Sequence, residues 1–266
     1  MCKCDLLLGD SNIILDTITP DSIDLVVTSP PYYNAREYSH WDTYESYLEW
    51  LRGIFLKVFK SIKCGHMCCV NISVVIEARE SRNSESKRLP IPFDFVHIMQ
   101  EIGYKFLEDI IWVKPSGASK NRNGGFYRMR QPIQYKPNVV NEYIFVFQKP
   151  IDKLIDHIIA SYSQNIRTQS LVLGDYEQSN VWYINPDSRN KHPAPFPVKL
   201  SDNLIKYYSY INDTVLDPFM GSGTVAVSCK NLNRNFIGIE IKDEYYKMAK
   251  RRLESNEVLE NLITLW

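Results

Sequence analysis

Short apolar runs rich in β-branched residues alternate with amphipathic stretches, and this alternation limits the folds open to the chain. Such a pattern is typical of an α/β sheet with crossover helices. The runs expected to form strands are Leu6–Leu8, Ile23–Thr28, Met67–Ile72, Asp109–Val113, Tyr143–Gln148, Thr214–Asp217 and Asn235–Glu240.

The amphipathic stretches predict the helices. Between Thr43 and Ile62, apolar residues recur every three or four positions, which places them on one helix face. The polar segment Glu77–Pro90 interrupts the pattern and is expected to form a long loop. The remaining expected helices are Phe93–Ile102, Leu200–Ser209, Thr224–Leu232 and Asp243–Glu257.

The composition excludes several classes of protein. Hydrophobic residues make up 44% of the 266 positions, which is ordinary for a globular chain and excludes a largely disordered one. Thirty-one basic residues balance 31 acidic ones, so any surface that binds nucleic acid must be a local basic patch. No apolar run approaches the roughly 20 residues of a membrane span, and the start lacks a signal-peptide core. We therefore expect a cytoplasmic protein without a membrane partner.

The six cysteines predict neither a disulfide framework nor a metal site. A zinc site from Cys2, Cys4, Cys64 and Cys68 is conceivable, but the absence of any CxxC pair argues against it. Cys68 and its neighbour Cys69 fall in a predicted strand, where a free thiol behaves as a small hydrophobic side chain.

A basic segment of 23 residues, 114–136, contains no acidic residue. A loop of this length inside a compact domain is usually functional or disordered. We interpret it as a candidate surface for DNA phosphates, with a solvated charged loop as the alternative. Its basic residues are Lys114, Lys120, Arg122, Arg128, Arg130 and Lys136.

A glycine-rich loop connects a predicted strand to a predicted helix. Its residues are Asp217, Pro218, Phe219, Met220, Gly221, Ser222, Gly223 and Thr224. Glycines let the backbone approach a ligand, and the helix start offers free N–H groups. Glu240 ends the next strand, where an acidic side chain is placed to accept hydrogen bonds from ribose hydroxyls. A dinucleotide is one candidate ligand, but the loop lacks the three-glycine fingerprint, which favours an adenosyl group with a carboxylate tail.

A second motif, Ser29-Pro30-Pro31-Tyr32, ends the apolar strand Ile23–Thr28. Prolines lack the N–H group, so their carbonyls remain as acceptors at the edge where open α/β sheets bind ligands. Ser29 adds an acceptor oxygen and Tyr32 a flat ring. The motif indicates a pocket that accepts hydrogen bonds from a planar NH2 group and stacks its ring. The alternative is a strand-ending turn with a packing tyrosine.

In this order, the two motifs resemble those of the permuted β group of amino-methylating DNA methyltransferases of bacterial restriction-modification systems. That family carries a (D/N/S)PP(Y/F/W) motif early and an FxGxG motif late. The resemblance extends to Gly9-Asp10, Trp112–Pro115, Asn141–Phe147 and His192–Pro197.

The resemblance implies a Rossmann-like methyltransferase sheet with helices on both faces, a circularly permuted motif order and a small inserted element. Residues 1–149 would form the catalytic half and residues 187–266 the cofactor-binding half of one domain. Residues 150–186, which lack a match to the family, would form the target-recognition insert.

The resemblance also implies that S-adenosylmethionine is the cofactor. The backbone of the glycine-rich loop would hold its methionine end, Asp217 its ammonium, and Glu240 its ribose. Asp10 is expected on the adenine side, with a helix cap as the alternative. Further cofactor candidates, with core packing as the alternative for the two aromatic ones, are Phe196, Lys199, Phe219 and Thr224.

For catalysis, the resemblance implies that Ser29 and the Pro30 carbonyl accept hydrogen bonds from the target amine. Pro31 completes the motif, and Tyr32 would stack on a flipped-out base. A serine at position 29 accompanies cytosine-N4 methylation in that family, so the resemblance implies transfer to the N4 amine of cytosine in double-stranded DNA. A cognate restriction endonuclease is the expected functional partner, and the chain is expected to be a monomer or a homodimer.

Three alternatives stay open. The same fold supports adenine-N6 methylation. A proline-pair pocket also serves methylation of a glutamine amide in a protein. Finally, the chain could be an inactive DNA-binding or cofactor-binding partner subunit.

Overall fold

An eight-stranded sheet forms the centre of the computed structural model, which describes residues 2–34, 40–77, 83, 86–115, 128–133, 135–186 and 196–255. Its strand order is β1-β10-β9-β2-β3-β7-β6-β8. The strands from β1 to β3 in this order run parallel, and β7 runs antiparallel to both β3 and β6. The bounds are β1 Cys4–Leu8, β2 Ile23–Thr28, β3 Ile62–Ile72, β6 Lys105–Val113, β7 Asn141–Gln148, β8 Val181–Tyr183, β9 Thr214–Asp217 and β10 Asn235–Glu240.

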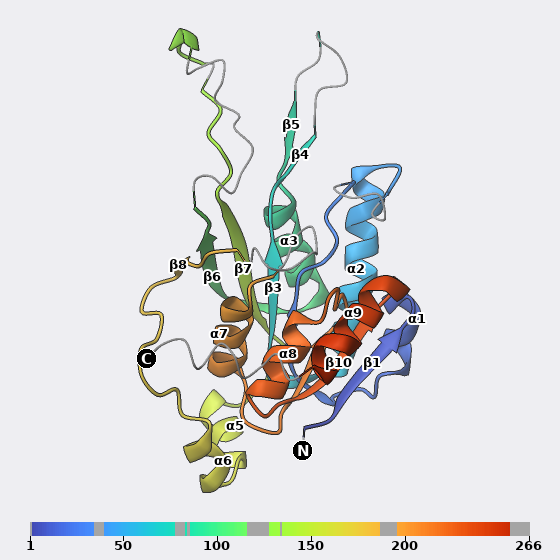
Figure 1. The fold of residues 1–266 in the computed structure, drawn as a ribbon, viewed down its shortest axis with the longest axis vertical. Coiled ribbons are helices and arrows are strands. Elements are labelled where there is room, and N and C mark those ends of the chain that lie inside the picture. Colours follow the sequence, from blue (N-terminus) through green and yellow to red (C-terminus); the bar gives the residue numbers. More distant parts are fainter. Residues whose placement is uncertain are drawn as a thin grey trace.

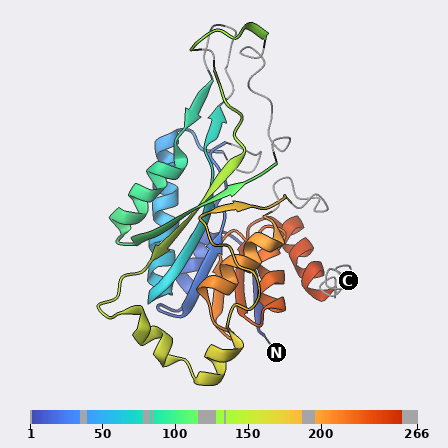
Figure 2. The same ribbon diagram turned by 90° about the vertical axis from the view of Figure 1, so that its left-hand side faces the viewer.

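Helices cover both faces of this sheet, as Figure 2 shows with the sheet between them. One core lies under α2 and α3, and a second lies under α7, α8 and α9. Strand β2 is buried at all six positions because it lies between these two cores, which explains its near-continuous apolar sequence. The prediction of an α/β fold is therefore confirmed. The helix bounds are α1 Ser11–Ile14, α2 Tyr44–Ser61, α3 Ile91–Ile102, α7 Val198–Tyr208, α8 Thr224–Asn231 and α9 Asp243–Glu254, with a 3₁₀ turn at Leu15–Thr17.

Local sequence signals explain where the long helices begin and end. Thr43 caps α2 through a reciprocal capping box with Ser46, which satisfies two N–H groups at the helix start. Helix α3 ends at Gly103, whose φ of 113° is a left-handed conformation that suits glycine. The predicted helices are therefore confirmed, with bounds that shift by up to three residues.

The prediction of a long loop at Glu77–Pro90 is wrong in part. Strands β4 (Val75–Glu77) and β5 (Lys87–Leu89) pair there as an antiparallel hairpin. Both strands are partly or fully exposed, so the alternating apolar pattern that marks a half-buried strand is absent. In Figure 1 this hairpin and the segment leading into β7 project from the same end of the sheet.

Residues 150–186 contain elements that the sequence did not predict. Helices α5 (Ile155–Ser161) and α6 (Gln164–Gln169) lie at the end of the sheet opposite the projecting hairpin (Figures 1 and 2). The same segment also supplies β8, which pairs with β6 in the main sheet. A target-recognition role for this segment stays a prediction.

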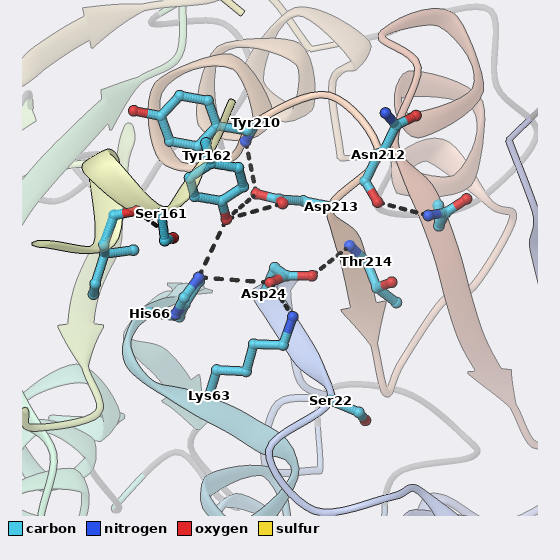
Figure 3. A network of polar contacts seen from close by, with 12 residues as sticks. Ser22, Asp24, Lys63, His66, Ser161, Tyr162, Tyr210, Asn212, Asp213 and Thr214 are labelled. Carbon is cyan, nitrogen blue, oxygen red and sulfur yellow. Dashed lines mark hydrogen bonds and ion pairs between the residues drawn. The ribbon is translucent and has the colours of Figure 1, made fainter. Parts of the chain in front are cut away.

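A polar network at the amino ends of β2, β3 and β9 is centred on buried Asp24 (Figure 3). Its Oδ1 lies 2.6 Å from Lys63 Nζ and 3.5 Å from His66 Nε2. Its Oδ2 accepts a 2.9 Å hydrogen bond from Thr214 N. This carboxylate therefore joins the three strands at their amino ends.

Tyr162, which follows α5, connects the helical segment to this network. Its hydroxyl donates to Asp213 Oδ1 at 3.0 Å and lies 3.4 Å from His66 Nε2. Its ring stacks on Tyr210, with a centroid distance of 4.1 Å. These contacts anchor α5 and α6 at the amino ends of the parallel strands (Figure 3).

Replacing Asp213 with asparagine is expected to alter how stability depends on pH. Burial, and then the neighbouring Asp24 carboxylate, raise the pKa of Asp213 to about 6. An exposed aspartate has a pKa of about 3.9, so protonation of Asp213 stabilises the folded state between about pH 6 and pH 4. That stabilisation is lost as the pH rises through about 6.

Urea unfolding at several pH values measures this effect. Asparagine does not titrate in this range. The free energy of unfolding of the wild type, relative to that of Asp213→Asn, should therefore increase as the pH falls from about 7 to about 5. A difference between the two proteins that stays constant over this range would contradict the prediction.

The cysteines of the described chain are free, and Cys229 is buried. Cys68 and Cys69 are also buried, which confirms their interpretation as small hydrophobic side chains. Within the same residues there is no group of three or more His, Cys, Asp or Glu side chains arranged to hold a metal ion. No described helix is long and apolar enough to cross a membrane.

Candidate active site

A cavity of about 670 Å³ opens at the carboxyl ends of β2, β3, β9 and β10. Open α/β sheets bind ligands in this position because the strand ends and the loops that follow them converge there. The glycine-rich loop after β9 and the Ser-Pro-Pro-Tyr motif after β2 both line this cavity. The two motifs are 185 residues apart in the sequence, and the fold brings them into one site.

Asp217 begins the glycine-rich loop at the end of β9 and is 3% exposed. Its Oδ1 accepts hydrogen bonds from Thr28 Oγ1 at 2.6 Å and from Phe219 N at 3.0 Å. Burial raises the pKa of this carboxyl to about 7, against the opposing effect of the two hydrogen bonds. A cation bound nearby would therefore favour its ionised form.

Glu240 at the end of β10 has its carboxylate held by the backbone. Oε2 accepts from Gly221 N at 2.9 Å, and Oε1 accepts from Lys242 N at 2.7 Å. A carboxylate has about four acceptor positions, so each oxygen can still accept a hydrogen bond. Two neighbouring hydroxyl groups, such as those of a ribose, fit this arrangement.

Gly223 is required by packing rather than by the cavity. It has a φ of 80°, and a Cβ atom at this position would lie 2.7 Å from Ala249 Cβ in α9. Arg252 of α9 also holds the loop, since its Nη1 donates to Ser222 O at 2.8 Å and lies 3.3 Å from Thr224 Oγ1. The close approach of α9 therefore fixes the loop's shape.

Aromatic side chains form another part of the cavity lining. Trp50 of α2 packs against Trp41 and Phe219, with centroid distances of 5.1 and 5.5 Å. Tyr47 of the same helix donates a 3.1 Å hydrogen bond to the Pro31 carbonyl, which holds the proline pair in place. The amphipathic helix α2 thus supports both motifs.

Beside Ser29, three polar side chains meet around the carboxylate of Glu142. Its Oε2 accepts from Asn71 Nδ2 at 2.6 Å and from Tyr32 Oη at 3.0 Å, and its Oε1 pairs with Lys114 Nζ. The Ser29 and Tyr32 hydroxyl oxygens are 3.4 Å apart. Burial, and then the Glu142 charge, raise the pKa of Tyr32 well above its ordinary value, so its hydroxyl stays protonated.

The structure brings most of the predicted site residues to the cavity. Asp10 caps α1, which confirms the helix-cap alternative, and it also lines the cavity, so its contact with the cofactor stays a prediction. The predicted residues that line the cavity are Asp10, Ser29, Pro30, Pro31, Tyr32, Lys114, Phe196, Asp217, Phe219, Gly221, Ser222, Thr224 and Glu240.

Other predicted residues lie elsewhere. Within the described chain, Gly223 and the exposed Lys199 are not part of the cavity lining. Lys114 lines the cavity, where it lies over the Trp112 ring at 4.5 Å and pairs with Glu142, and its contact with DNA phosphates stays a prediction. Of the other basic residues of this segment, Lys120 and Arg122 lie outside the described residues. Arg128, Arg130 and Lys136 are exposed and do not line the cavity.

Sequence reasoning assigned no role to several residues that line the cavity, above all Asn71, Glu142, Trp41 and Trp50. Asn71 carries a usable signal, because it is a polar residue that follows the apolar run Met67–Val70 near the carboxyl end of β3. Glu142 lies at the amino end of an antiparallel strand, and its position depends on the strand order.

The structure is an α/β fold in which the glycine-rich loop and the Ser-Pro-Pro-Tyr motif line one cavity at the carboxyl ends of the strands. Residues 23–251 match the model of the N6/N4 DNA methylase family. The chain therefore belongs to this family of DNA methylases.

Individual relatives agree with this assignment. The type II beta methyltransferase M.BslI of Bacillus sp. (strain NEB-606) is 30% identical over 257 residues, which cover 94% of this chain. This chain spans 27% of that relative's length.

Two solved structures share the fold. TTHA0409 of Thermus thermophilus, provisionally described as a DNA modification methylase and solved with S-adenosyl-L-methionine, has a TM-score of 0.74 at 24% identity, over 93% of this chain and 92% of its own. The cytosine-N4-specific PvuII DNA methyltransferase has a TM-score of 0.70 at 23% identity, over 98% of this chain and 90% of its own.

Proposed function

We propose that the chain transfers a methyl group from S-adenosylmethionine to the exocyclic N4 amine of a flipped-out cytosine in double-stranded DNA. The observation that carries this proposal is the single cavity shared by the glycine-rich loop and Ser29-Pro30-Pro31-Tyr32. One motif suits a nucleoside cofactor and the other suits a planar amine, and methyl transfer requires the two to meet. Protection against a cognate restriction endonuclease is the biological role that a type II relative suggests.

The loop side of the cavity fits S-adenosylmethionine. Glu240 has acceptor positions left for the two ribose hydroxyls, and its carboxylate is already oriented by Gly221 N and Lys242 N. Asp217, with a pKa of about 7, would be ionised by the cofactor's ammonium. Phe219 offers a ring surface for the adenosyl or methionyl part. When bound, the cofactor supplies a methyl group on a positively charged sulfur.

The Ser-Pro-Pro-Tyr side positions the amine that is methylated. A base amine is a poor nucleophile because its lone pair is delocalised into the ring. Ser29 Oγ and the Pro30 carbonyl would accept its two N–H bonds and so direct the lone pair out of the ring plane. Positioning of this kind is a large part of catalysis in a direct displacement. The base must leave the duplex to reach the cavity, and the Tyr32 ring would contact it there.

Methylation of cytosine at ring carbon C5 requires a thiol nucleophile. None of the described residues that line the cavity is a cysteine, which favours an amine as the acceptor. Serine at position 29 favours cytosine N4 over adenine N6, as does the specificity of the structurally similar PvuII enzyme. Adenine-N6 methylation is the second candidate.

Identification of the methylated nucleoside tests this proposal. The protein is incubated with labelled S-adenosylmethionine and unmethylated bacterial DNA, which is then digested and analysed by mass spectrometry. We expect N4-methylcytosine. Label in N6-methyladenine would retain the enzyme class but overturn the assigned base, and label in protein alone would overturn the DNA substrate.

Loss of basic side chains from the 114–136 segment is expected to weaken DNA binding and flatten its salt dependence. Arg128 and Arg130 are exposed, so both can reach phosphates. If each contacts one phosphate, the double alanine variant should reduce the slope of log K against log salt by about 2.

The control is a double alanine variant of two exposed lysines at the other end of the sheet, Lys60 and Lys153. Fluorescence anisotropy with labelled duplex DNA, at several salt concentrations, measures the slope for all three proteins. Equal slopes for the wild type and the Arg128/Arg130 variant would assign these arginines to a solvated surface.

A further inference from the structure

Glu142 occupies the centre of the polar cluster beside Ser29, and its neighbours come from separate parts of the sheet. Asn71 lies on β3, Lys114 follows β6, Glu142 lies on β7, and Tyr32 follows β2. Glu142 receives donors at both oxygens, from Asn71 and Tyr32 at Oε2 and from Lys114 at Oε1. A carboxylate with a lysine partner only accepts hydrogen bonds, so the direction of each of these contacts is fixed.

This fixed direction determines how the Tyr32 hydroxyl behaves. Its single hydrogen points to Glu142 Oε2, 3.0 Å away. The Tyr32 oxygen can then only accept from Ser29 Oγ, which lies 3.4 Å away. The Ser29 hydrogen is directed to Tyr32, one Ser29 lone pair accepts from Asn71 Nδ2 at 3.3 Å, and the other remains for a further donor. Without Glu142, the hydrogen bond between the two hydroxyls could run in either direction.

The direction of the Ser29 hydroxyl matters for the reaction proposed above. A target NH2 group brings hydrogens to the serine, so the serine must offer a lone pair. A Ser29 hydrogen pointing at the amine would oppose its approach. The high pKa of Tyr32 is consistent with this arrangement, because the tyrosine remains a donor to Glu142 over the whole working pH range.

We propose that Glu142 is a positioning residue that acts through Tyr32 to hold Ser29 as a hydrogen-bond acceptor for the amine. This inference rests on the proposed function. It predicts energetic coupling along the line from Glu142 to Tyr32 to Ser29. A purely structural role, in which the cluster only ties β3, β6 and β7 together, predicts no such coupling with Ser29.

A double-mutant cycle tests the coupling. Tyr32→Phe removes one hydroxyl and keeps the ring, and Glu142→Gln keeps the shape of the side chain and removes its charge. Each variant should lower turnover at saturating cofactor and DNA by about tenfold, the scale of one hydrogen bond to a charged group. Both changes disrupt the same chain of hydrogen bonds from Glu142 through Tyr32 to Ser29. The turnover of the double variant should therefore be about tenfold lower than that of the wild type, rather than about a hundredfold lower. The affinity for S-adenosylmethionine should not change.

The chain offers a matched control pair. Tyr44 Oη donates to Asp94 Oδ2 at 2.6 Å between α2 and α3, and neither residue lines the described cavity. Tyr44→Phe removes a hydroxyl-to-carboxylate hydrogen bond of the same type, Asp94→Asn removes the charge of its acceptor, and both variants should leave turnover unchanged. Thermal unfolding of every variant separates loss of fold from loss of function.

The outcomes are distinguishable. A wild-type protein that methylates no DNA would overturn the proposed function itself. An active wild type whose Tyr32→Phe variant has normal turnover, or whose two single effects multiply in the double variant, would overturn the coupling. If Glu142→Gln does not fold, Tyr32→Phe is combined with Ser29→Ala instead. That double variant should be no slower than Ser29→Ala alone, and a further loss would contradict the proposal.

Discussion

Ser29→Ala should lower methyl transfer by roughly a hundredfold or more, the scale of removing one preorganised hydrogen-bonding group from a reacting centre. Alanine cannot accept a hydrogen bond from the target amine, so the lone pair of that amine stays conjugated with the base. The Pro30 carbonyl remains, so residual transfer is expected. Ser29 and Glu240 belong to different motifs, so the affinity for S-adenosylmethionine should stay near that of the wild type.

Two measurements separate these effects. Isothermal titration calorimetry gives the cofactor affinity, and incorporation of labelled methyl groups into DNA gives the transfer rate at saturating cofactor. Circular dichroism of the variant checks that β2 and its neighbours are intact. Near-normal transfer by Ser29→Ala would show that this side chain does not activate the amine.

The central strands could be predicted because their sequences report their surroundings. Strand β2 is buried on both faces, so it reads as an apolar run, and its predicted bounds Ile23–Thr28 are those observed. The β4–β5 hairpin gives no such signal, because its side chains do not alternate between a core and solvent. Burial therefore decides which elements a single sequence reveals.

The same reasoning explains which parts of the site were missed. The two motifs are continuous in the sequence, so the chemistry of each could be interpreted from its own residues. The Lys114–Glu142 pair joins residues that meet only through the antiparallel register of β6 and β7, where Val113 faces Asn141. A basic segment of 23 residues begins at Lys114, and its charge alone suggested a different role for this lysine. Pairing across strands is the information that composition and spacing do not contain.

Glu240→Gln is expected to show the opposite pattern to Ser29→Ala. Both oxygens of Glu240 already accept a backbone N–H, from Gly221 and Lys242. A glutamine has one oxygen, so its NH2 group must face one of these donors, and one ribose hydroxyl loses its charged acceptor. Hydrogen bonds to charged groups contribute about 1.5–3 kcal/mol each, so the affinity for S-adenosylmethionine should fall by roughly 10- to 100-fold.

Turnover at saturating cofactor should stay close to that of the wild type, because the Ser-Pro-Pro-Tyr side of the cavity is unchanged. Calorimetry and the transfer assay are applied as for Ser29→Ala, with the exposed Glu244→Gln on α9 as the matched control. If Glu240→Gln retains full affinity, the ribose does not bind at this carboxylate. A loss of affinity here and a loss of rate at Ser29 would together assign the cofactor to the loop side and the base to the proline-pair side.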